Sequence, residues 1–276
     1  MKFKLVFVLF NVVIIGSFLF IFLMPLGILG ADYAGMFIKQ NWFLPLIFIG
    51  ILAVMDSYFI MNFKLFGLLE KEDWKGCAVY LEEQVMKRHR IRTQYVKLLI
   101  NAYLVTSNTE KIKELEIFIR KEKPKLLNTF ALEFSIPYLL ANEPSRLISY
   151  LEEFLNEKVP QKGWILWCYA FALLLLQKHS DAKERLFPLA KGEKDPLLRL
   201  LSLYMLDPFT TDDEEVKACV EEGVAALKKK YTATSWNKVM NRYKENVLVV
   251  ILSRVIEEAT TWLFPENKNQ QSKQDQ

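Results

Sequence analysis

A histidine, a serine and an aspartate follow one another at His179, Ser180 and Asp181, and these residue types could in principle form the relay of a hydrolase. Such a relay needs the base between the nucleophile and the orienting acid, a geometry that three consecutive residues at a turn cannot reach. We therefore interpret the trio as a helix cap. The acidic run from Asp212 to Glu215 fits the first turn of a helix, because no further ligands converge on it to hold a metal.

Other signatures of catalysis are missing from the 276-residue sequence. It contains no Walker loop, no GxGxxG, no HExxH and no GxSxG. The three cysteines, Cys77, Cys168 and Cys219, are far apart and form no CxxC pair, which indicates reduced thiols rather than a disulfide framework or a zinc site. We expect no enzymatic activity, no cofactor, no metal and no small-molecule substrate.

Charge and apolar content divide the chain. The net charge is +4, and Lys and Arg alternate with Glu instead of gathering on one face, so a nucleic-acid partner is not expected. The hydrophobic fraction is 52%, and most of the excess lies before residue 64. About two hundred residues remain after that point, enough for a sizeable core.

Two segments have the length and composition of membrane spans. Residues 5–30 carry no charge, and residues 42–63 carry a single one, Asp56. Each can cross a hydrocarbon core of about 30 Å. Because the connector between them is short, we predict an antiparallel transmembrane hairpin over residues 1–64. A cleaved signal peptide is the competing interpretation, but the first apolar run is too long and the second follows at once.

The lysines beside these segments predict the orientation. The connector holds only Lys39, whereas five lysines flank the other ends of the two spans: Lys2, Lys4, Lys64, Lys71 and Lys75. The positive-inside rule then places both termini in the cytoplasm. We expect a multi-pass protein of the cytoplasmic (inner) membrane, in contact with the lipid bilayer.

An acid inside a span indicates a function until shown otherwise. Asp56 lies about 12 Å above the inner boundary, and Asn11 lies about 10.5 Å above it on the other span, as judged from the helical rise. The two could form a hydrogen-bonded pair across the hairpin. Asp56 could instead contact a helix of a partner subunit, or handle a proton or ion.

The run KRHRIR at residues 87–92 is the most basic stretch of the chain. It could contact lipid or an acidic partner. It could also be a solvated turn that places cations at a helix C-terminus, where they are favourable to the helix dipole.

After residue 66 the apolar periodicity is helical throughout and no stretch alternates with period two. Pro124, Pro160 and Pro196 are 36 residues apart, and cap-type residues recur near 108, 145 and 180. We predict an all-α domain of stacked antiparallel helix pairs over residues 65–265, with residues 163–176 as a buried core helix. A long last helix should cap the array, and the polar tail 266–276 should be disordered.

A period in the mid-thirties built from two helices resembles the tetratricopeptide family. Leu99 and Tyr103 stand where that family has a large apolar residue and a tyrosine in its first helix, and Pro124 stands at its closing proline. The resemblance implies an α-solenoid whose first helices line a concave groove for peptides. The residues that it places in the groove are Gln94, Lys97, Asn101, Glu133, Tyr169 and Leu173.

The same resemblance bears on the ligand. Lys97 and Asn101 resemble the first pair of the family's carboxylate clamp, but the later clamp positions hold side chains that donate no hydrogen bond: Phe134, Leu166 and Ala170. An apolar or mixed peptide is therefore expected rather than a C-terminal carboxylate. The alternative is that the register is shifted by one or two positions and the apolar members face a neighbouring helix.

These patterns together predict a non-enzymatic, membrane-anchored scaffold or adaptor. It would bind a protein partner through its helical-repeat surface at the cytoplasmic face. The alternative is a structural subunit of a larger membrane complex that contacts its partners mainly through the two spans.

Overall fold

The computed structural model describes residues 3–243 and 246–265, and every regular element in these ranges is a helix. The predicted all-α class is therefore confirmed. The chain divides into two compact units, Met1–Arg90 and Ile91–Gln276. The predicted disordered tail at 266–276 and the anchoring Lys2 lie outside the described residues.

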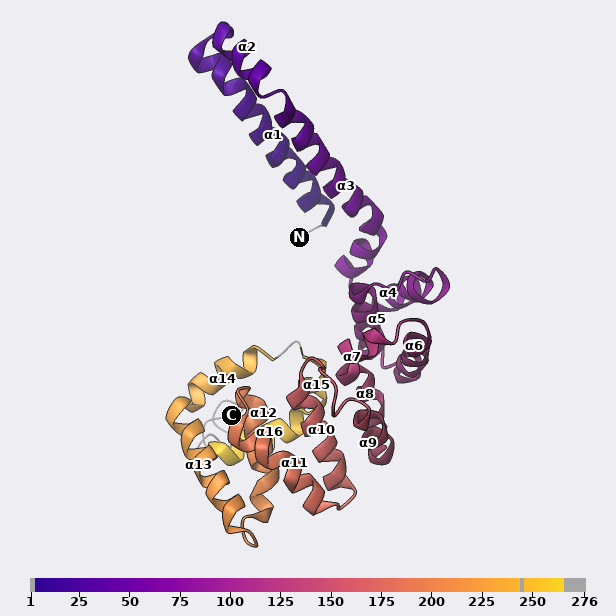
Figure 1. Ribbon diagram of the computed structural model, residues 1–276, viewed down its shortest axis with the longest axis vertical. Coiled ribbons are helices and arrows are strands. Elements are labelled where there is room, and N and C mark those ends of the chain that lie inside the picture. Colours follow the sequence, from indigo (N-terminus) through magenta and orange to yellow (C-terminus); the bar gives the residue numbers. More distant parts are fainter. Residues whose placement is uncertain (1–2, 244–245, 266–276) are drawn as a thin grey trace, which may run out of the picture. The chain divides into compact units, whose positions relative to one another are not determined.

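The first unit contains five helical elements. They are α1 (Phe3–Leu29), α2 (Ala31–Gln40), α3 (Phe43–Glu70), α4 (Trp74–Glu82) and the π-helix η1 (Glu83–Lys87). Helices α1 and α3 run antiparallel, with α2 at the end that joins them (Figure 1).

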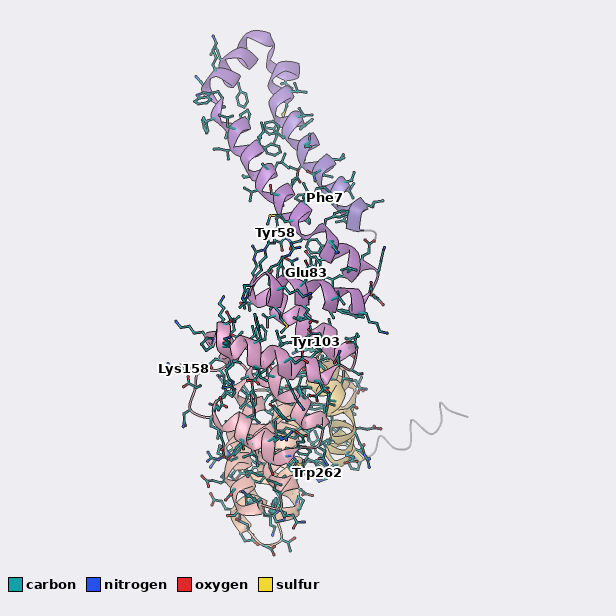
Figure 2. The ribbon with its side chains drawn as sticks, turned by 90° about the vertical axis from the view of Figure 1, so that its right-hand side faces the viewer. Phe7, Tyr58, Glu83, Tyr103, Lys158 and Trp262 are labelled. Atoms are coloured by element: carbon teal, nitrogen blue, oxygen red, sulfur yellow. The ribbon has the colours of Figure 1, made fainter. Side chains whose placement is uncertain are left out.

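Aromatic rings fix the register of α1 against α3. Phe7 packs on Phe59 with ring centroids 5.1 Å apart, and Phe18 stacks on Phe48 at 4.1 Å. The two contacts are eleven residues apart on each helix, so the antiparallel register is the same at both. Figure 2 shows Phe7 and Tyr58 at the same end of the helix pair.

Helix α3 is long and apolar enough, by length and composition, to cross a membrane, and no other described helix meets both criteria. Its most apolar window is not buried within the protein, unlike the core helix of a soluble domain. Bulky apolar side chains are exposed along it from Phe43 to Phe63. The helix continues without a break past residue 64 to Glu70, so the predicted end of the hairpin falls inside it.

The second unit consists of the remaining helices. They are α5 (Thr93–Val105), α6 (Thr109–Glu122), α7 (Lys125–Thr129), α8 (Ala131–Leu140), α9 (Pro144–Glu152), α10 (Lys162–Leu175), α11 (His179–Gly192), α12 (Pro196–Leu206), the 3-10 helix η2 (Asp207–Phe209), α13 (Glu214–Lys230), α14 (Ala233–Asn241), α15 (Val247–Ile251) and α16 (Ser253–Leu263). Consecutive long helices pack on each other, α10 with α11 and α11 with α12 most extensively.

One turn recurs four times along the chain. It is centred on a residue in the left-handed conformation, and these residues are Glu72, Ser107, Asn142 and Gln177. In each turn the left-handed residue donates its N–H to the carbonyl three residues before, and the next residue donates to the carbonyl five residues before. This pattern is the Schellman motif, which ends one helix and directs the chain into the next.

The turns give the repeat its period. The helices that follow them begin at Trp74, Thr109, Pro144 and His179, and α13 begins at Glu214. Successive starts are 35 residues apart. The predicted period of 36, taken from the prolines, was one residue too long, because prolines mark loops whose length varies whereas the hydrogen-bonded turn has a fixed size.

The turns also change how these helices are capped. Asn108 precedes α6 without a side-chain cap, while Ser145 and Ser180 lie inside α9 and α11 rather than at their N-caps. Asn108 therefore occupies the predicted N-cap position but makes no cap hydrogen bond. The caps predicted at Ser145 and Ser180 were wrong, including the helix cap inferred for His179, Ser180 and Asp181. Asp213 does cap α13, accepting from two backbone N–H groups, which confirms the acidic run as a helix start.

The core of the second unit is centred on α10. Trp167, Cys168 and Ala170 are almost fully buried, so the predicted core helix at 163–176 is confirmed. The predicted long last helix is wrong, because the segment is broken into α14, α15 and α16. At the first break the Tyr243 hydroxyl donates to Asp195 Oδ1 at 2.6 Å, and Asn246 caps a new helix.

Candidate functional site

The two polar residues predicted to pair inside the membrane lie at the same level of α1 and α3. Asn11 donates its side-chain amide to the carbonyl of Phe7, four residues earlier on its own helix, at 3.1 Å. The Oδ1 atom of Asp56 is buried and has no hydrogen-bond partner among the described residues. The register therefore permits the pair, while the side-chain amide of Asn11 is directed to its own backbone.

Four of the predicted groove residues lie on α5 and α8. Gln94 and Lys97 are exposed, and Asn101 and Glu133 are half-buried. Burial raises the pKa of the Glu133 carboxyl, and the charge of Lys97 acts in the opposite direction. The structure thus brings Lys97 and Glu133 into electrostatic range of each other.

The other two predicted groove residues lie on α10 and are buried. Leu173 is 3% exposed and Tyr169 is 9% exposed. The Tyr169 hydroxyl donates to Oε1 of Glu152, the last residue of α9, at 3.1 Å. Burial and this hydrogen bond both raise the pKa of Tyr169. These two side chains face neighbouring helices, as the shifted-register alternative expected.

The C-terminal segment covers part of the first-helix face. Helix α16 packs against α12, where the rings of Tyr204 and Trp262 meet at 5.8 Å, and α15 packs against α8 (Figure 1). Trp236 is fully buried and its indole N–H donates to the Thr260 hydroxyl at 3.3 Å. The C-terminal helices therefore cover part of α8 and α12, each of which is the first helix of its pair.

A charged cluster links α6 and α9, each of which is the second helix of its pair. The guanidinium of Arg120 donates Nε–H to Glu116 Oε1 at 2.8 Å and Nη1–H to Glu153 Oε2 at 2.7 Å. The hydrogen bonds to Glu153 and Glu116 raise the pKa of Arg120, and burial opposes them only in part. Glu116 is only 6% exposed, so one of the two carboxylates lies in the protein interior.

A surface cavity opens beside this cluster. Its volume is about 460 Å³, and its wall includes Tyr138 and Tyr150 together with the exposed polar residues Ser145, Arg146 and Ser149. The two tyrosine rings lie 5.6 Å apart. The hydroxyl of Tyr150 is buried without a hydrogen-bond partner in the described part of the chain, and burial followed by the charge of Glu116 raises its pKa.

Glu116 is a buried charge at a repeat position that is otherwise mostly occupied by buried leucine. The equivalent residues of α4, α9 and α11 are Leu81, Leu151 and Leu186, each fully buried, whereas α13 has the exposed Glu221. A charge where three copies have leucine breaks the hydrophobic pattern, and such departures tend to occur at functional or strained sites. The sequence analysis missed this cluster, although the repeat itself carried the signal.

The cluster offers several groups that can take part in recognition. It has an ion pair, two tyrosine hydroxyls and two serines, and the described residues contain no group of His, Cys, Asp and Glu that could hold a metal. A guanidinium held between two carboxylates presents a fixed array of donors and acceptors. Such an array suits hydrogen bonding to the backbone and polar side chains of a peptide.

Comparison with known proteins gives the chain its relatives. It is similar to an uncharacterized protein of Treponema pallidum (strain Nichols), with 28% identity over 281 residues that cover 96% of this chain and 88% of that protein. No solved structure matches the chain. The model of a family described as "Uncharacterised Treponema protein" matches residues 111–265, which include the charged cluster and the helices around it. Because this match covers more than half of the sequence, the chain belongs to that family.

Proposed function

We propose that the protein is a non-enzymatic adaptor anchored in the cytoplasmic membrane, which holds a protein partner on its helical-repeat surface. The observation that carries the anchoring is the bare apolar face of α3. Its side chains from Phe43 to Phe63 are exposed over a length of about 30 Å, the thickness of a bilayer core. Soluble monomers rarely expose so large a contiguous apolar surface.

The first apolar helix is the second span of this proposal. Helix α1 has 27 residues and packs antiparallel to α3 through stacked aromatic rings. Its exposed side chains are almost all apolar. With both helices in the bilayer, the lysine distribution predicts that the termini and the second unit lie in the cytoplasm.

Cysteine labelling tests the anchoring and the orientation. Two reporters, Gly35→Cys and Ser149→Cys, are placed singly in a Cys219→Ser background, where Cys77 and Cys168 are buried. An impermeant maleimide should label position 35 in right-side-out vesicles and position 149 only in inverted vesicles. Release of the protein from membranes by alkaline carbonate, or the reverse labelling pattern, would contradict the proposal.

The partner surface in this proposal includes the cavity between α6 and α9. Ser149 is exposed on its rim, so Ser149→Trp fills the cavity without burying anything in the core. Ser180→Trp on α11 is a matched exposed control. Partners isolated in mild detergent with the unaltered protein should be lost with the first variant and kept with the second. Equal recovery with both would remove the cavity from the proposal.

A second candidate function rests on Asp56. An acid whose Oδ1 is buried without a partner in its own described chain suits a structural subunit that meets another protein within the membrane. In that case Asp56→Leu should release a co-purifying membrane protein, while Ser149→Trp should not. An unchanged set of membrane partners with Asp56→Leu would argue against this candidate.

A further inference from the structure

Below the exposed apolar band, the side chains of α3 change character within one turn. Phe63 and Lys64 are exposed, and Leu65 is 3% exposed because α4 packs against this part of the helix. In the proposed anchoring, the edge of the hydrocarbon therefore lies near Lys64.

Helix α4 follows the turn at Glu72 and packs against α3. The ammonium of Lys64 lies over the ring of Tyr80 at 5.2 Å from its centroid, so the Tyr80 ring lies near the proposed membrane edge. Lys87 follows Tyr80 by seven residues, which is no more than about 10 Å of helix. The end of η1 is thus held close to the headgroup layer.

Three cations are presented at this end. Lys87, Arg88 and Arg90 are all exposed, and His89 between them is in the left-handed conformation. The turn is closed by backbone hydrogen bonds from Arg88 N–H to the carbonyl of Glu83 and from Arg90 N–H to that of Gln84. The backbone that carries the cations is therefore ordered rather than a loose tail.

The acids of the first unit offset these cations only in part. Glu70, Glu72 and Asp73 belong to the far turn, a helix length away from Lys87. Nearer to the cations, Glu82 is half-buried. Glu83 pairs with Arg88 at 2.6 Å, but both side chains are substantially exposed, and such pairs are weak. Lys87 has no ion pair among the described residues.

We propose that Lys87, Arg88 and Arg90 form a docking surface for the headgroups of acidic phospholipids. The proposal rests on the membrane anchoring proposed above. Juxtamembrane cations gain from the negative potential of the cytoplasmic leaflet when they lie within a Debye length, about 8 Å, of its surface. The contact would fix the first unit against the membrane in addition to the spans.

The test uses the full chain in mild detergent with added dioleoylphosphatidylglycerol or dioleoylphosphatidylcholine. Bound lipids are counted by native mass spectrometry. The variant is Lys87→Gln/Arg88→Gln/Arg90→Gln. The matched control is Lys228→Gln/Lys229→Gln/Lys230→Gln, which removes three exposed cations at the end of α13.

The first variant should weaken phosphatidylglycerol binding by about 100-fold at low salt, and the control by less than about twofold. Phosphatidylcholine binding should not change. Exchange of Lys for Arg and Arg for Lys at the three positions should retain binding. Unchanged affinity in the first variant, or equal losses in both variants, would overturn the proposal. If the triple variant misfolds by circular dichroism, Lys87→Gln alone should still weaken binding by about fivefold, and no effect would count against the proposal.

Failure of this proposal can be told apart from failure of the anchoring. If alkaline carbonate leaves the chain in the membrane while the two triple variants bind lipid alike, only the lipid surface is refuted. If carbonate extracts the chain, the anchoring falls and the lipid surface falls with it.

Discussion

Replacing Arg120 with methionine should destabilise the protein far more than replacing Glu116 with leucine. Arg120 provides the only cation bonded to Glu116 among the described contacts, and the Glu116 side chain is 8% exposed against 41% for Arg120. Removing one partner of a buried ion pair costs about 3–5 kcal/mol. Because the Arg120 end of this pair is partly hydrated, we expect about 2–3 kcal/mol for Arg120→Met.

Glu116→Leu leaves a different situation. Arg120 keeps Glu153 and its contact with water, while the interior loses a charge and gains the leucine that three equivalent positions already hold. Replacing a buried charge by a well-packed apolar group is often neutral or stabilising. We expect a change between zero and about 1 kcal/mol in favour of folding.

The double variant separates the two effects. Glu116→Leu/Arg120→Met removes both charges, so most of the loss seen with Arg120→Met should be recovered, a coupling of about 2 kcal/mol. Glu153→Gln serves as the control, because Glu153 is 48% exposed and should contribute less than about 0.5 kcal/mol.

Thermal unfolding of the full chain in detergent, followed by circular dichroism, measures these differences. A loss of 2–3 kcal/mol corresponds to a fall in Tm of about 4–12 °C for a domain of this size. The reasoning is refuted if Glu116→Leu lowers Tm as much as Arg120→Met does, or if the two effects add in the double variant. The first outcome would mean that Glu116 itself supports the fold, and the second that Arg120 acts independently of Glu116.

Three other predictions follow from particular contacts. Gln177→Gly should raise the free energy of unfolding by about 0.5–1 kcal/mol in thermal melts, because glycine relieves a left-handed conformation that glutamine tolerates poorly, whereas destabilisation would mean that the side chain is needed. Asp195→Ala should lower it by about 2–4 kcal/mol, since Asp195 caps α12 and accepts from Tyr243, and Tyr243→Phe should account for less than half of that loss. Burial raises the pKa of the Cys168 thiol to about 12, so at pH 8 it is protonated and a thiol reagent should modify the half-exposed Cys219 first and Cys168 only on unfolding. Fast modification of Cys168 in the folded protein would contradict the last of these.

The helical class, the core helix and the apolar α3 could be predicted because each depends on local pattern. The uncharged run around Trp167 is bounded closely by lysines and is too short to span, and it is buried as expected. Exposed apolar residues on α3 follow equally from composition. These features need no knowledge of what lies elsewhere in the chain.

The path of the C-terminal segment could not be predicted in this way. Tyr243 bonds to Asp195, which is 48 residues earlier, and Trp236 bonds to Thr260 after an intervening turn. Apolar periodicity is continuous from Trp236 to Ile251, and so it favours one long helix. The break is set by long-range contacts that a local pattern does not contain.

The charged cluster was not predicted because the repeat period inferred from the prolines was one residue too long. With a period of 36, Glu116 aligns with Glu152 and Pro188, which are not buried, so an acid at that position looks ordinary. With a period of 35 it aligns with Leu151 and Leu186, and the same acid becomes an interior anomaly. The correct period depends on turns whose left-handed residues are not glycine, so the residue types at these positions do not predict the turns. Once the hydrogen bonds of these turns are known, equivalent positions of the repeats can be compared with one another. An interior charge with an open cavity beside it, in a position where three other copies hold a buried leucine, is therefore the first place to look for what this protein binds.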